Sequence, residues 1–514
     1  MGPRRAARHE QRGDQPPRRR RRDLRKRSQP MYFEWKKKPF IAPSDLSGTP
    51  STPDVTVVGG GPSGLAMAIT LAMRGMNVIV LEQRDTVSDG SRAIGFHRGT
   101  SQFFEHIGIG ERFQQMCHVR PVNRLFISGE VFAETRYSLP EHERHPEQAI
   151  LQQCWVEEML VDRAADFPSI DIRWQSTVEK VVPDDDGVTI SVRTPEGSYD
   201  LRTPYVVAAD GARGTVRREL GLKFETPVNP LISDRHFVIC DFELETDLEP
   251  GRRLYLDLPY DPGASALFHY QPFGVWRLDY PLSDEQDPEA ETTPERAHAR
   301  VRQHLDMMGE TQDFNIIWTT SYRARARTLP RYAYGRVLFV GDAAHQTPIF
   351  GGRGLNSGFA DVWNLGWRLP RVVKGIDTPD SLERYSDERV HVMLGNLEAL
   401  TQVATFMTQP TPGTRLIRQA ALQLARTEPF VRELVDGHSA RKVDAYPREE
   451  GEPTLVGTPL GEVDLTDTAG GVTLGTFLRD QLGDGYTLFR YDPADDADAH
   501  IADVDDLLPF TVVT

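Results

Sequence analysis

Three short apolar runs, each followed at once by a turn that contains glycine, divide the chain. Residues 55–58 (VTVV) lead into GGGPSG, residues 205–208 (YVVA) lead into Asp210-Gly211, and residues 337–340 (VLFV) lead into Gly341-Asp342. Apolar runs of this length, bounded by turn signals, are typical of strands that are buried on both faces of a sheet. Because apolar residues at helical spacing follow the first turn and helix starts follow the other two, the chain is predicted to be an α/β protein.

The middle and the end of the chain show other periodicities. Residues 264–282 alternate apolar and polar positions around Pro272-Phe273-Gly274, which predicts a β-hairpin inside a β-rich domain over residues 226–329. Apolar positions at helical spacing predict a long helix over residues 381–407 and another helix over residues 414–435. No uninterrupted apolar run approaches the roughly 20 residues of a membrane-spanning helix, so no membrane span is expected.

Charge and cysteine content narrow the class of protein. The first 40 of the 514 residues carry a net charge of +11, and the other 474 carry −26. The basic block could bind nucleic acid or another anionic surface, but without apolar periodicity it predicts a disordered tail over residues 1–50, and nucleic acid is not expected as a partner. Cys117, Cys154 and Cys240 are widely spaced and form no C-x-x-C, so neither disulfides nor a metal site is expected. The arginines precede no apolar export segment, and a cytoplasmic protein is therefore predicted.

The first turn is a G-x-G-x-x-G motif between two apolar strands, the second of which covers residues 77–81. Gly59 permits the tight turn, Gly61 lets the backbone approach a pyrophosphate, and Gly64 allows close packing of helix on strand. Glu82 follows the second strand directly and is placed to accept a hydrogen bond from a ribose hydroxyl. This context predicts a dinucleotide-binding site, and the glutamate favours FAD or NAD over NADP.

The third turn has a similar construction. A buried strand ends in Asp342, and the chain crosses a proline and a glycine-rich loop before a helix begins at about Leu355-Asn356. A helix start framed by glycines can turn backbone N–H groups toward an anion or a carbonyl oxygen, helped by the helix dipole. Asp210-Gly211 alone is a common turn. Its likeness to the third motif, a buried strand that ends in an acid, makes a role in the same site the stronger interpretation.

Together the three motifs, GGGPSG, DGARGTVR and GDAAHQTPIFGGRGLNSG, identify a family resemblance. In order and approximate spacing they resemble the single-component FAD-dependent aromatic hydroxylases of the p-hydroxybenzoate hydroxylase fold, and most of all the branch of phenol, pentachlorophenol and 3-(3-hydroxyphenyl)propionate hydroxylases. The resemblance covers about residues 50–410. It implies a Rossmann-like FAD-binding domain (residues 51–225 and 330–410) interleaved with a β-sheet substrate domain (residues 226–329). A helical segment (residues 411–445) and a short, truncated thioredoxin-like segment (residues 446–514) would follow.

The resemblance also implies roles in binding FAD. Glu82 would bind the adenosine ribose, Arg92 would lie by the flavin or the pyrophosphate, and Gln153 would contact FAD. Asp210 would hold the chain where FAD and the nicotinamide meet, and Asp342 would accept a hydrogen bond from the ribityl chain. The full set of expected cofactor-binding residues is Gly59, Gly61, Pro62, Ser63, Gly64, Glu82, Gln83, Arg84, Arg92, Gln153, Asp210, Gly211, Gly341, Asp342, Pro348, Gly352, Gly354, Leu355 and Asn356.

Five further residues are candidates for catalysis or substrate contact. Arg353 stands where many relatives have glutamine, and it could favour an anionic flavin, pair with an acidic substrate, or form a salt bridge away from the site. His345 could shuttle protons or be a polar turn residue. His269, Tyr270 and Arg277 lie on the predicted hairpin and are candidate substrate contacts, although half of the residues on a two-faced strand point elsewhere.

The function implied is that of an FAD-dependent monooxygenase, which hydroxylates an aromatic and in particular a phenolic substrate with NADH or NADPH and O₂ through a flavin C4a-hydroperoxide. The expected partners are therefore a small aromatic molecule, O₂ and NAD(P)H, and the C-terminal segment would be a cap or a homodimer contact. Two alternatives stay open. One is an epoxidase or other oxidoreductase of the same fold that acts on a polyketide or an antibiotic-like compound, and the other is a non-catalytic flavin-binding carrier.

Overall fold

The computed structural model describes most of the chain between residues 33 and 435. The described residues are 33–137, 144–227, 234–283, 285–408, 411–435 and 446–447, together with four short strands nearer the C-terminus. The chain divides into two compact units, residues 1–34 and residues 35–514, and every element described below belongs to the second unit. Of the basic tail predicted over residues 1–50, residues 1–32 lie outside the described residues.

Residues 35–50 differ from the disordered tail that the charge pattern predicts. Lys38 Nζ lies 3.0 Å from the carboxylate of Glu158, and Asp45 lies 2.9 Å from the guanidinium of Arg173. These ion pairs hold the segment against the FAD-binding part of the chain. Both partners lie more than 100 residues along the sequence, so no local pattern could indicate them.

The three apolar runs form neighbouring strands of one sheet, as predicted. β1, β12 and β20 are adjacent and parallel in a six-stranded sheet of order β19-β20-β12-β1-β2-β8, in which β19 alone runs antiparallel to its neighbour. Because parallel strands end at the same edge, the three turns converge there. The strands are β1 (Val55–Val58), β2 (Val78–Leu81), β8 (Ile170–Arg173), β12 (Tyr205–Ala208), β19 (Ala333–Tyr334) and β20 (Val337–Phe339).

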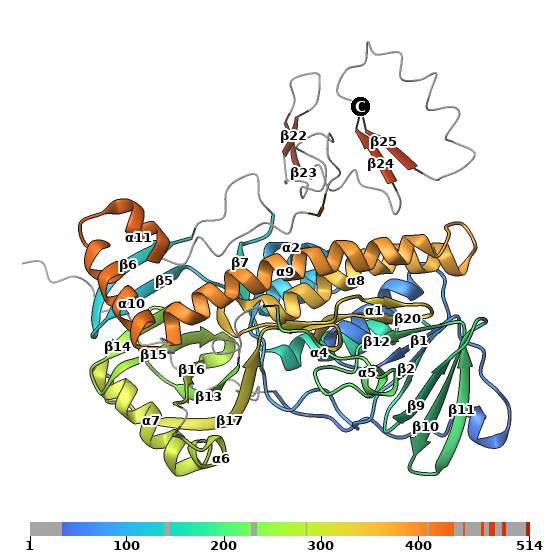
Figure 1. Ribbon diagram of the computed structural model, residues 1–514, viewed down its shortest axis with the longest axis horizontal. Coiled ribbons are helices and arrows are strands. Elements are labelled where there is room, and N and C mark those ends of the chain that lie inside the picture. The colour runs from blue at the N-terminus through green and yellow to red at the C-terminus, as the bar shows by residue number, and fades with distance from the viewer. Residues whose placement is uncertain are drawn as a thin grey trace, which may run out of the picture. The chain divides into compact units, whose positions relative to one another are not determined.

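Helices and a smaller sheet pack around these strands in one hydrophobic core (Figure 1). α1 contacts both α4 and α8, and its residues from Ser63 to Ala72 are buried. The antiparallel sheet β11-β10-β9 contributes Val178, Ile190 and Leu201 to the same core. These elements are α1 (Pro62–Ala72), α2 (Arg98–His106), α3 (Gly110–Met116), α4 (Gln153–Ala164), α5 (Thr215–Glu219), α8 (Arg353–Val373), β9 (Thr177–Pro183), β10 (Val188–Thr194) and β11 (Gly197–Thr203), with β3 (Gly95–His97), β4 (His118–Val119) and β7 (Gln148–Ile150) in a small sheet and 3-10 turns η1 (Ser44–Ser47), η3 (Gly341–Ala343) and η4 (Phe350–Gly352).

A seven-stranded sheet of order β17-β13-β16-β15-β14-β5-β6 forms the second domain. The predicted hairpin is confirmed as β15 and β16, joined through Pro272–Gly274, and α7 packs on one face of the sheet, where Val301 meets Phe268 and Trp276 in a core. The elements are β5 (Val122–Ile127), β6 (Glu130–Arg136), β13 (Asp234–Leu244), β14 (Arg252–Leu258), β15 (Asp261–Gln271), η2 (Pro272–Gly274), β16 (Val275–Pro281), α6 (Pro288–Glu291), α7 (Pro294–Met307) and β17 (Phe314–Arg325), followed by the short paired strands β18 (Arg327–Thr328) and β21 (His345–Gln346).

This sheet differs from the predicted domain boundary. Its strands β5 and β6 come from residues 122–136, which the sequence interpretation placed in the FAD-binding domain. β5 pairs in parallel with β14, about 130 residues further along the chain. Pairing across such a distance leaves no signal in a local hydrophobic pattern, so the prediction had no means of assigning these strands to the second domain.

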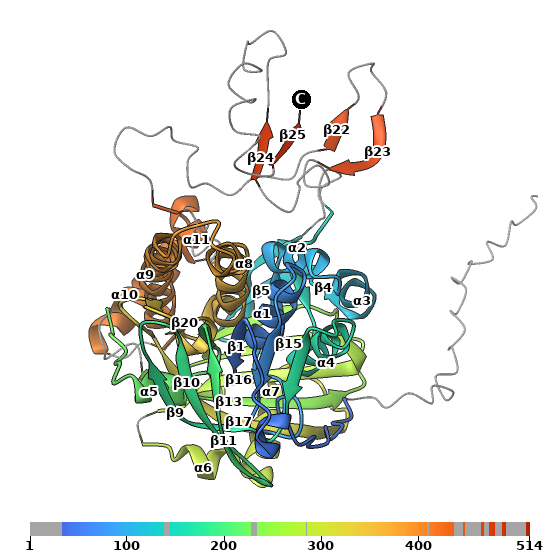
Figure 2. The ribbon, with the colours of Figure 1, turned by 90° about the vertical axis from the view of Figure 1, so that its right-hand side faces the viewer.

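The C-terminal part begins with a long helix, as predicted. α9 (Asp380–Thr408) lies beside α8, and Figure 2 shows the two helices side by side above the strands. The single helix predicted over residues 414–435 is instead two helices, α10 (Pro412–Leu424) and α11 (Pro429–Val435). Pro429 has no N–H to continue α10, and it occupies the first position of the next helix, which proline favours.

The last strands occur as two pairs. β22 (Asp464–Thr466) and β23 (Val472–Phe477) are antiparallel, and β24 (Tyr486–Phe489) and β25 (Phe510–Val513) are parallel. Most of residues 446–514 lie outside the described residues, so the thioredoxin-like assignment of this segment stays a prediction. None of the helices among the described residues combines the length and the apolar character that crossing a bilayer needs.

Candidate active site

The glycines of the first motif have two different tasks. A Cβ atom at Gly59, where φ is +107°, would overlap the carbonyl oxygen of Ala209, and one at Gly64 would overlap the carbonyl oxygen of Gly59. At Gly61, where φ is −75°, an added Cβ would meet no atom within 4 Å. Gly64 therefore allows α1 to pack closely on the end of β1, as predicted, and Gly59 lets the turn lie against Ala209 after β12. Gly61 leaves space open at the start of α1, next to Pro62.

Glu82 directly follows β2 and bounds this part of the site. Its carboxylate accepts hydrogen bonds from the backbone N–H of Gly60 (2.7 Å) and of Arg84 (2.9 Å), and Arg84 Nε lies 3.2 Å away. The side chain is 4% exposed, while the neighbouring Gln83 is exposed. Each carboxylate oxygen can accept more than one hydrogen bond, so Glu82 keeps acceptor capacity for a ribose hydroxyl.

Asp210 follows β12 and is held beneath a tight loop. Its Oδ2 accepts a hydrogen bond from the N–H of Val216 (2.9 Å), while its buried Oδ1 has no partner among the described residues. Burial raises the pKa of the carboxyl to about 6. A Cβ at Gly214 would overlap this carboxylate, and Gly211 has φ +75° with open space beyond it, so the loop needs both glycines.

Asp342 follows β20 at the same edge of the sheet. It is exposed to solvent although protein atoms surround it closely, and burial raises the pKa of its carboxyl while the charges of His345 and Arg92 oppose the shift. An accessible carboxyl in such surroundings is typical of a cleft. Gly341, at φ +59°, brings this loop against α1, because a Cβ there would lie 2.8 Å from Ser63 Oγ.

His345 lies in a buried network behind this loop. Its Nε2 is 2.6 Å from Asp361 Oδ2, which also accepts the N–H of Gly341 at 3.0 Å, and Arg389 Nε lies 2.8 Å from Asp361 Oδ1. The imidazole is fully buried. Because His345 is buried behind the loop, a role in positioning Asp342 is favoured. Proton transfer by His345 stays a prediction. Asp361 and Arg389 lie on α8 and α9 and were missed, because no local motif marks them.

The loop before α8 turns through two glycines. Gly351 (φ +85°) and Gly352 (φ +62°) precede Arg353, the half-buried first residue of the helix. Asn356 fixes this turn, since its amide nitrogen donates to the carbonyl oxygens of Gly95 (2.9 Å) and Gly352 (2.5 Å). Its Oδ1 accepts from the His97 N–H (3.0 Å) and the Thr100 hydroxyl (2.6 Å). Asn356 thus serves to place the helix N-terminus. Pro348 is buried, and Gly354 and Leu355 are half-buried.

Residues 88–93 connect this site to the second domain. Glu157 accepts the N–H of Ser88 (2.6 Å), and Gln153 Oε1 accepts the N–H of Ala93 (3.1 Å) while its nitrogen donates to Glu157 (2.6 Å). From the other side, Arg277 donates to the carbonyl oxygens of Ser91 and Arg92, the latter at 2.8 Å. Gln153 therefore shapes the segment that carries Arg92, and a direct contact with FAD stays a prediction for both residues.

The three hairpin candidates lie on two faces of the sheet. His269 and Arg277 are direct cross-strand partners and share the face that meets residues 88–93. Tyr270 lies on the other face, where its ring is 5.3 Å from Trp276 and 4.8 Å from His118. The guanidinium of Arg277 donates to the carboxylate of Asp241 and to two backbone carbonyl oxygens. His269 is thus the best placed of the three to meet a substrate.

The residues at the sheet edge fit FAD. The space at Gly61 and Gly211, the unpaired Oδ1 of Asp210, and the accessible Asp342 are open on the side where the three motifs converge. Backbone N–H groups at the start of α1 suit a pyrophosphate, and Glu82 suits a ribose. Among the described residues, no three His, Cys, Asp or Glu side chains are grouped to hold a metal ion.

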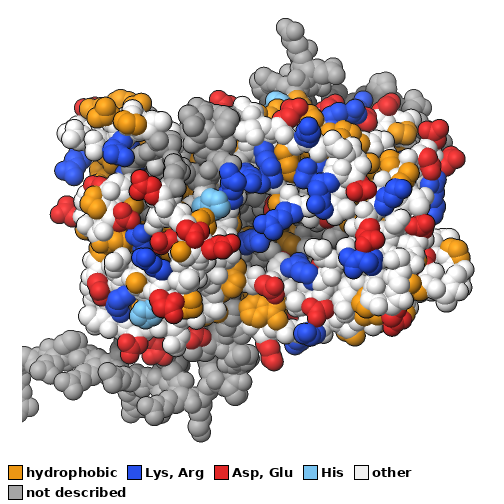
Figure 3. Space-filling model, turned by 60° about the horizontal axis from the view of Figure 1, so that its bottom comes forward, with side chains coloured by type: hydrophobic (Ala, Val, Ile, Leu, Met, Phe, Trp, Pro, Cys, Tyr) orange, Lys and Arg blue, Asp and Glu red, His pale blue; other side chains and the backbone are white. Residues whose placement is uncertain are grey.

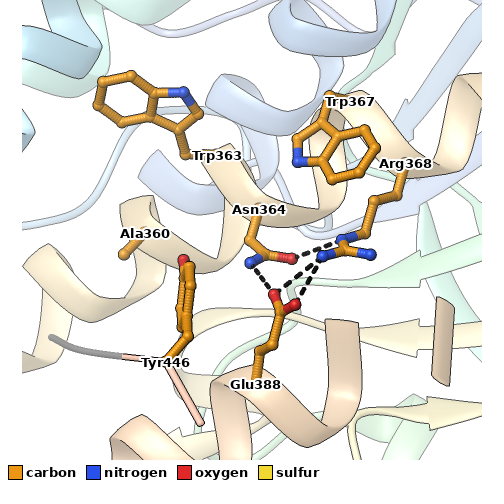
Figure 4. Close-up of a pocket in the computed structure, with 7 residues that line it drawn as sticks. All are labelled: Ala360, Trp363, Asn364, Trp367, Arg368, Glu388 and Tyr446. Carbon is orange, nitrogen blue, oxygen red and sulfur yellow. Dashed lines mark hydrogen bonds and ion pairs between the residues drawn. The ribbon is translucent and has the colours of Figure 1, made fainter. Parts of the chain in front are cut away.

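A separate cavity of about 370 Å³ lies along α8 (Figure 4). Trp363 and Trp367 line it from α8, and Tyr446 lines it from the C-terminal segment. The polar groups in its wall satisfy one another, because Arg368 donates to Glu388 (2.8 Å) and Asn364 donates to the same carboxylate (2.7 Å). This pairing indicates a structural role and not a reactive site.

Comparison with known proteins agrees with this geometry. Residues 52–399 match the family model described as FAD binding domain. The chain is 30% identical to 3-(3-hydroxy-phenyl)propionate/3-hydroxycinnamic acid hydroxylase of Burkholderia cenocepacia (strain HI2424), over 85% of this chain and 80% of that protein. It is 31% identical to the 12-dehydrotetracycline 5-monooxygenase/anhydrotetracycline 6-monooxygenase of Streptomyces rimosus, over 87% of this chain and 88% of that protein. The solved structure of an anhydrotetracycline hydroxylase from Streptomyces rimosus is similar with a TM-score of 0.68 and 28% identity, over 90% of each chain.

Proposed function

The chain belongs to the family of FAD-dependent aromatic hydroxylases and is an FAD-dependent monooxygenase, and from this premise we propose that it hydroxylates a small phenol with NADH or NADPH and O₂. The observation that carries the proposal is the contact between the polar face of the seven-stranded sheet and residues 88–93. Through Arg92, this segment acts electrostatically on Asp342 and on Tyr322 of β17. A ring bound on the seven-stranded sheet would therefore lie beside the edge of the six-stranded sheet where the three motifs converge.

Bound FAD would supply the redox chemistry, taking a hydride from the nicotinamide and activating O₂ for transfer of one oxygen atom to the ring. The protein residues would bind FAD, orient it and stabilise its negative charge. The start of α1 would face the pyrophosphate, Glu82 the ribose and Asp342 the ribityl chain. The N-terminus of α8, which Asn356 fixes, would stabilise negative charge on the reduced ring system without any side-chain base.

A basic surface supports a transient nicotinamide dinucleotide as co-substrate. Lys and Arg side chains gather around a hollow near the middle of one face of the molecule (Figure 3). Arg217 of α5 and Arg327 of β18 both lie over the ring of Phe224, at 4.5 Å and 4.4 Å, close to the Asp210 loop. On a chain whose body is acidic, these two cations beside the Asp210 loop would attract an anionic dinucleotide. They do not discriminate between NADH and NADPH.

A polyketide or an antibiotic-like substrate is the second candidate. It is supported by the similarity to an enzyme named for tetracycline intermediates. A non-catalytic flavin carrier is no longer proposed, because the chain belongs to a family of enzymes.

The test is NADH and NADPH oxidation by the FAD-loaded protein against simple phenols, aryl acids and polycyclic phenols, with H₂O₂ measured in parallel. Stimulation by simple phenols with little H₂O₂ supports the proposal. Stimulation only by polycyclic phenols would replace it with the second candidate, and oxidation that yields H₂O₂ with every compound would contradict hydroxylation.

Asp342→Ala tests the third motif. The variant loses the carboxylate expected to accept a hydrogen bond from the ribityl chain, and a hydrogen bond to a charged group contributes about 1.5–3 kcal/mol. We expect FAD affinity to fall about 10- to 100-fold, with turnover falling in step. FAD retained through gel filtration gives the measurement, and Asp186→Ala, at an exposed aspartate between β9 and β10, is the control. Unchanged FAD content and turnover in Asp342→Ala would show that the motif is misassigned.

Arg353→Gln tests the departure from the family pattern. Arg353 opens α8 beside the glycine turn, where a fixed cation would act on the flavin or on an acidic substrate. We expect FAD content to stay near normal, while kcat/KM for the best substrate or the fraction of NAD(P)H used for hydroxylation changes about tenfold. Arg353→Lys should retain most of the wild-type behaviour if charge alone matters. Wild-type kinetics in Arg353→Gln would place the side chain outside the site.

A further inference from the structure

A row of polar residues crosses the seven-stranded sheet on the face that meets residues 88–93. The register aligns one residue from each of five adjacent strands, in the order Asp241, Arg277, His269, Arg252 and Asn123. Directly opposed residues of a sheet share a face, so these side chains line up across it. One step along the same face of β16 lies Asp279. Charged residues in the middle of a covered sheet are costly unless each of them has a partner.

One end of the row is fully satisfied. Arg277 donates from Nε to Asp241 Oδ1 (2.7 Å) and from Nη2 to Asp241 Oδ2 (2.8 Å). Its Nη2 also donates to the carbonyl oxygen of Ser91, and its Nη1 donates to that of Arg92 (2.8 Å). This buried pair has a structural explanation, since it joins the sheet to the segment that carries Arg92.

The neighbouring groups are not satisfied. His269 is 8% exposed and Asp279 is 4% exposed, and they touch each other through Nε2 and Oδ2 at 3.3 Å. The other polar atom of each, Nδ1 of His269 and Oδ1 of Asp279, is buried without a hydrogen-bond partner among the described residues, and so is the hydroxyl of Tyr322. Buried polar atoms are nearly always paired, and three unpaired ones on one sheet face indicate a missing ligand.

The sheet face that carries these unpaired atoms meets the segment of Arg92, because Arg277, the cross-strand partner of His269, donates to the carbonyl oxygen of Arg92 at 2.8 Å. Burial raises the pKa of Tyr322, the charge of Asp279 raises it further, and Arg92 opposes the shift. Arg92 also opposes the raised pKa of Asp342. Arg92 thus acts electrostatically on both Tyr322 and Asp342, and residues 88–93 link the sheet face to the Asp342 loop.

The protonation states of Asp279 and His269 suit a site that accepts a proton. Burial raises the pKa of Asp279 to about 7, against the opposing charges of Arg277 and Arg252. Burial and three nearby arginines hold the pKa of His269 well below its usual range, so the imidazole is neutral. The charged or titratable groups that act on the pair are Arg252, Arg277, Asp241, Cys240 and Tyr322 from the strands, and Arg120 from an adjoining segment.

We propose that Asp279, oriented by His269 and accompanied by Tyr322, is the catalytic residue that binds the phenolic hydroxyl and takes its proton. The inference rests on the proposed function. In this step the phenol O–H bond breaks, its electron pair stays on the phenolate oxygen, and the proton forms an O–H bond at Asp279 Oδ1. No electron is gained or lost. The nearby Arg252 and Arg277 stabilise the phenolate, whose ring is more electron-rich and reacts more readily with an electrophilic oxygen.

Asp279→Asn separates this role from a structural one when two phenols are compared at pH 8. Unsubstituted phenol arrives protonated and needs the acceptor, whereas 4-nitrophenol is acidic enough to arrive largely as the anion. We expect Asp279→Asn to lower the rate of product formation from phenol about 100-fold and that from 4-nitrophenol by less than about fivefold. Asp313→Asn, at an exposed aspartate, is the matched control. Equal losses with both phenols, or no loss with either, would overturn the proposal.

If the wild-type protein acts on neither phenol, that result contradicts the proposed function but does not test the role of Asp279. A measurement without substrate therefore tests Asp279 by itself. Because folding raises the pKa of Asp279 to about 7, the carboxyl favours the folded state in acid, and this contribution is lost as the pH rises through about 7. Asp279→Asn should therefore unfold at a temperature several degrees above wild type at pH 8, with the difference shrinking toward pH 5. A difference that does not vary with pH would overturn the assignment of Asp279 as a proton acceptor near neutrality.

Discussion

Gly61→Ala is expected to fold normally and to lose FAD, whereas Gly64→Ala is expected to lose both the cofactor and part of its stability. At Gly61 the backbone has φ −75°, which alanine adopts freely, and the added methyl group meets no protein atom within 4 Å. The methyl group instead fills the space where the backbone would approach a pyrophosphate. We expect FAD affinity to fall about 100-fold, which corresponds to about 2.7 kcal/mol.

Gly64→Ala acts on the protein itself. Its methyl group would overlap the carbonyl oxygen of Gly59 and approach Ala209 Cβ to 3.3 Å, so α1 must shift away from β1. Overpacking of this kind costs about 1–3 kcal/mol. Urea unfolding of the apo forms measures the stability difference, and FAD titration measures affinity. The interpretation of the motif fails if apo Gly61→Ala is as unstable as Gly64→Ala, or if it binds FAD like wild type.

Asp361→Ala is expected to cause the largest loss of stability among the substitutions considered. The carboxylate is fully buried and joins His345, Arg389 and the N–H of Gly341. Removing one partner from a buried charged group leaves the others uncompensated and costs about 3–5 kcal/mol. Denaturant unfolding of the apo protein gives the measurement. We also expect weaker FAD binding, because the loop that carries Asp342 loses its anchor.

The acid dependence provides a second signature of this network. Burial alone would raise the pKa of Asp361, but His345 and Arg389 hold it below its ordinary value. A lowered pKa in the folded state means that the carboxylate stabilises the protein above the ordinary pKa of an aspartate and that this contribution is lost in stronger acid. Asp361→Asn should thus lose less stability on acidification than wild type does. If the two proteins lost the same stability on acidification, the contacts of Asp361 with His345 and Arg389 would not depend on the charge of its carboxylate.

Sequence reasoning could place the three motifs at one edge of the sheet because each of them follows chain-local rules. A buried strand, a glycine turn and a helix start are written within about 20 residues, and parallel strands place the ends of three such units at one edge. The long helix α9 and the hairpin of β15 and β16 were predictable for the same reason. The break between α10 and α11 could have been predicted too, since Pro429 marks it.

The row of polar residues proposed to meet the substrate depends on how the strands pair, and the sequence does not show this pairing. His269 could be named as a candidate from its strand, but its alignment with Arg252 and its contact with Asp279 depend on how β14, β15 and β16 pair. The same holds for Asp361 and Arg389, which lie on different helices and meet only after α8 and α9 pack together. Such residues look like ordinary charged positions until the tertiary partners are known.

The interleaved order of strands also constrains how the protein can be made. β12 receives its neighbour β20 only after the whole second domain has been synthesised, since Val206 pairs with Val337 across 131 residues. Arg389, which completes the network behind Asp342, comes later still. At a translation rate of roughly 5–20 residues per second, synthesis of these 131 residues takes about 7–26 s, and β12 has an open sheet edge during that time. A ribosome that stalls within residues 230–330 would therefore release a chain that exposes this edge and cannot retain its cofactor, a species prone to aggregate.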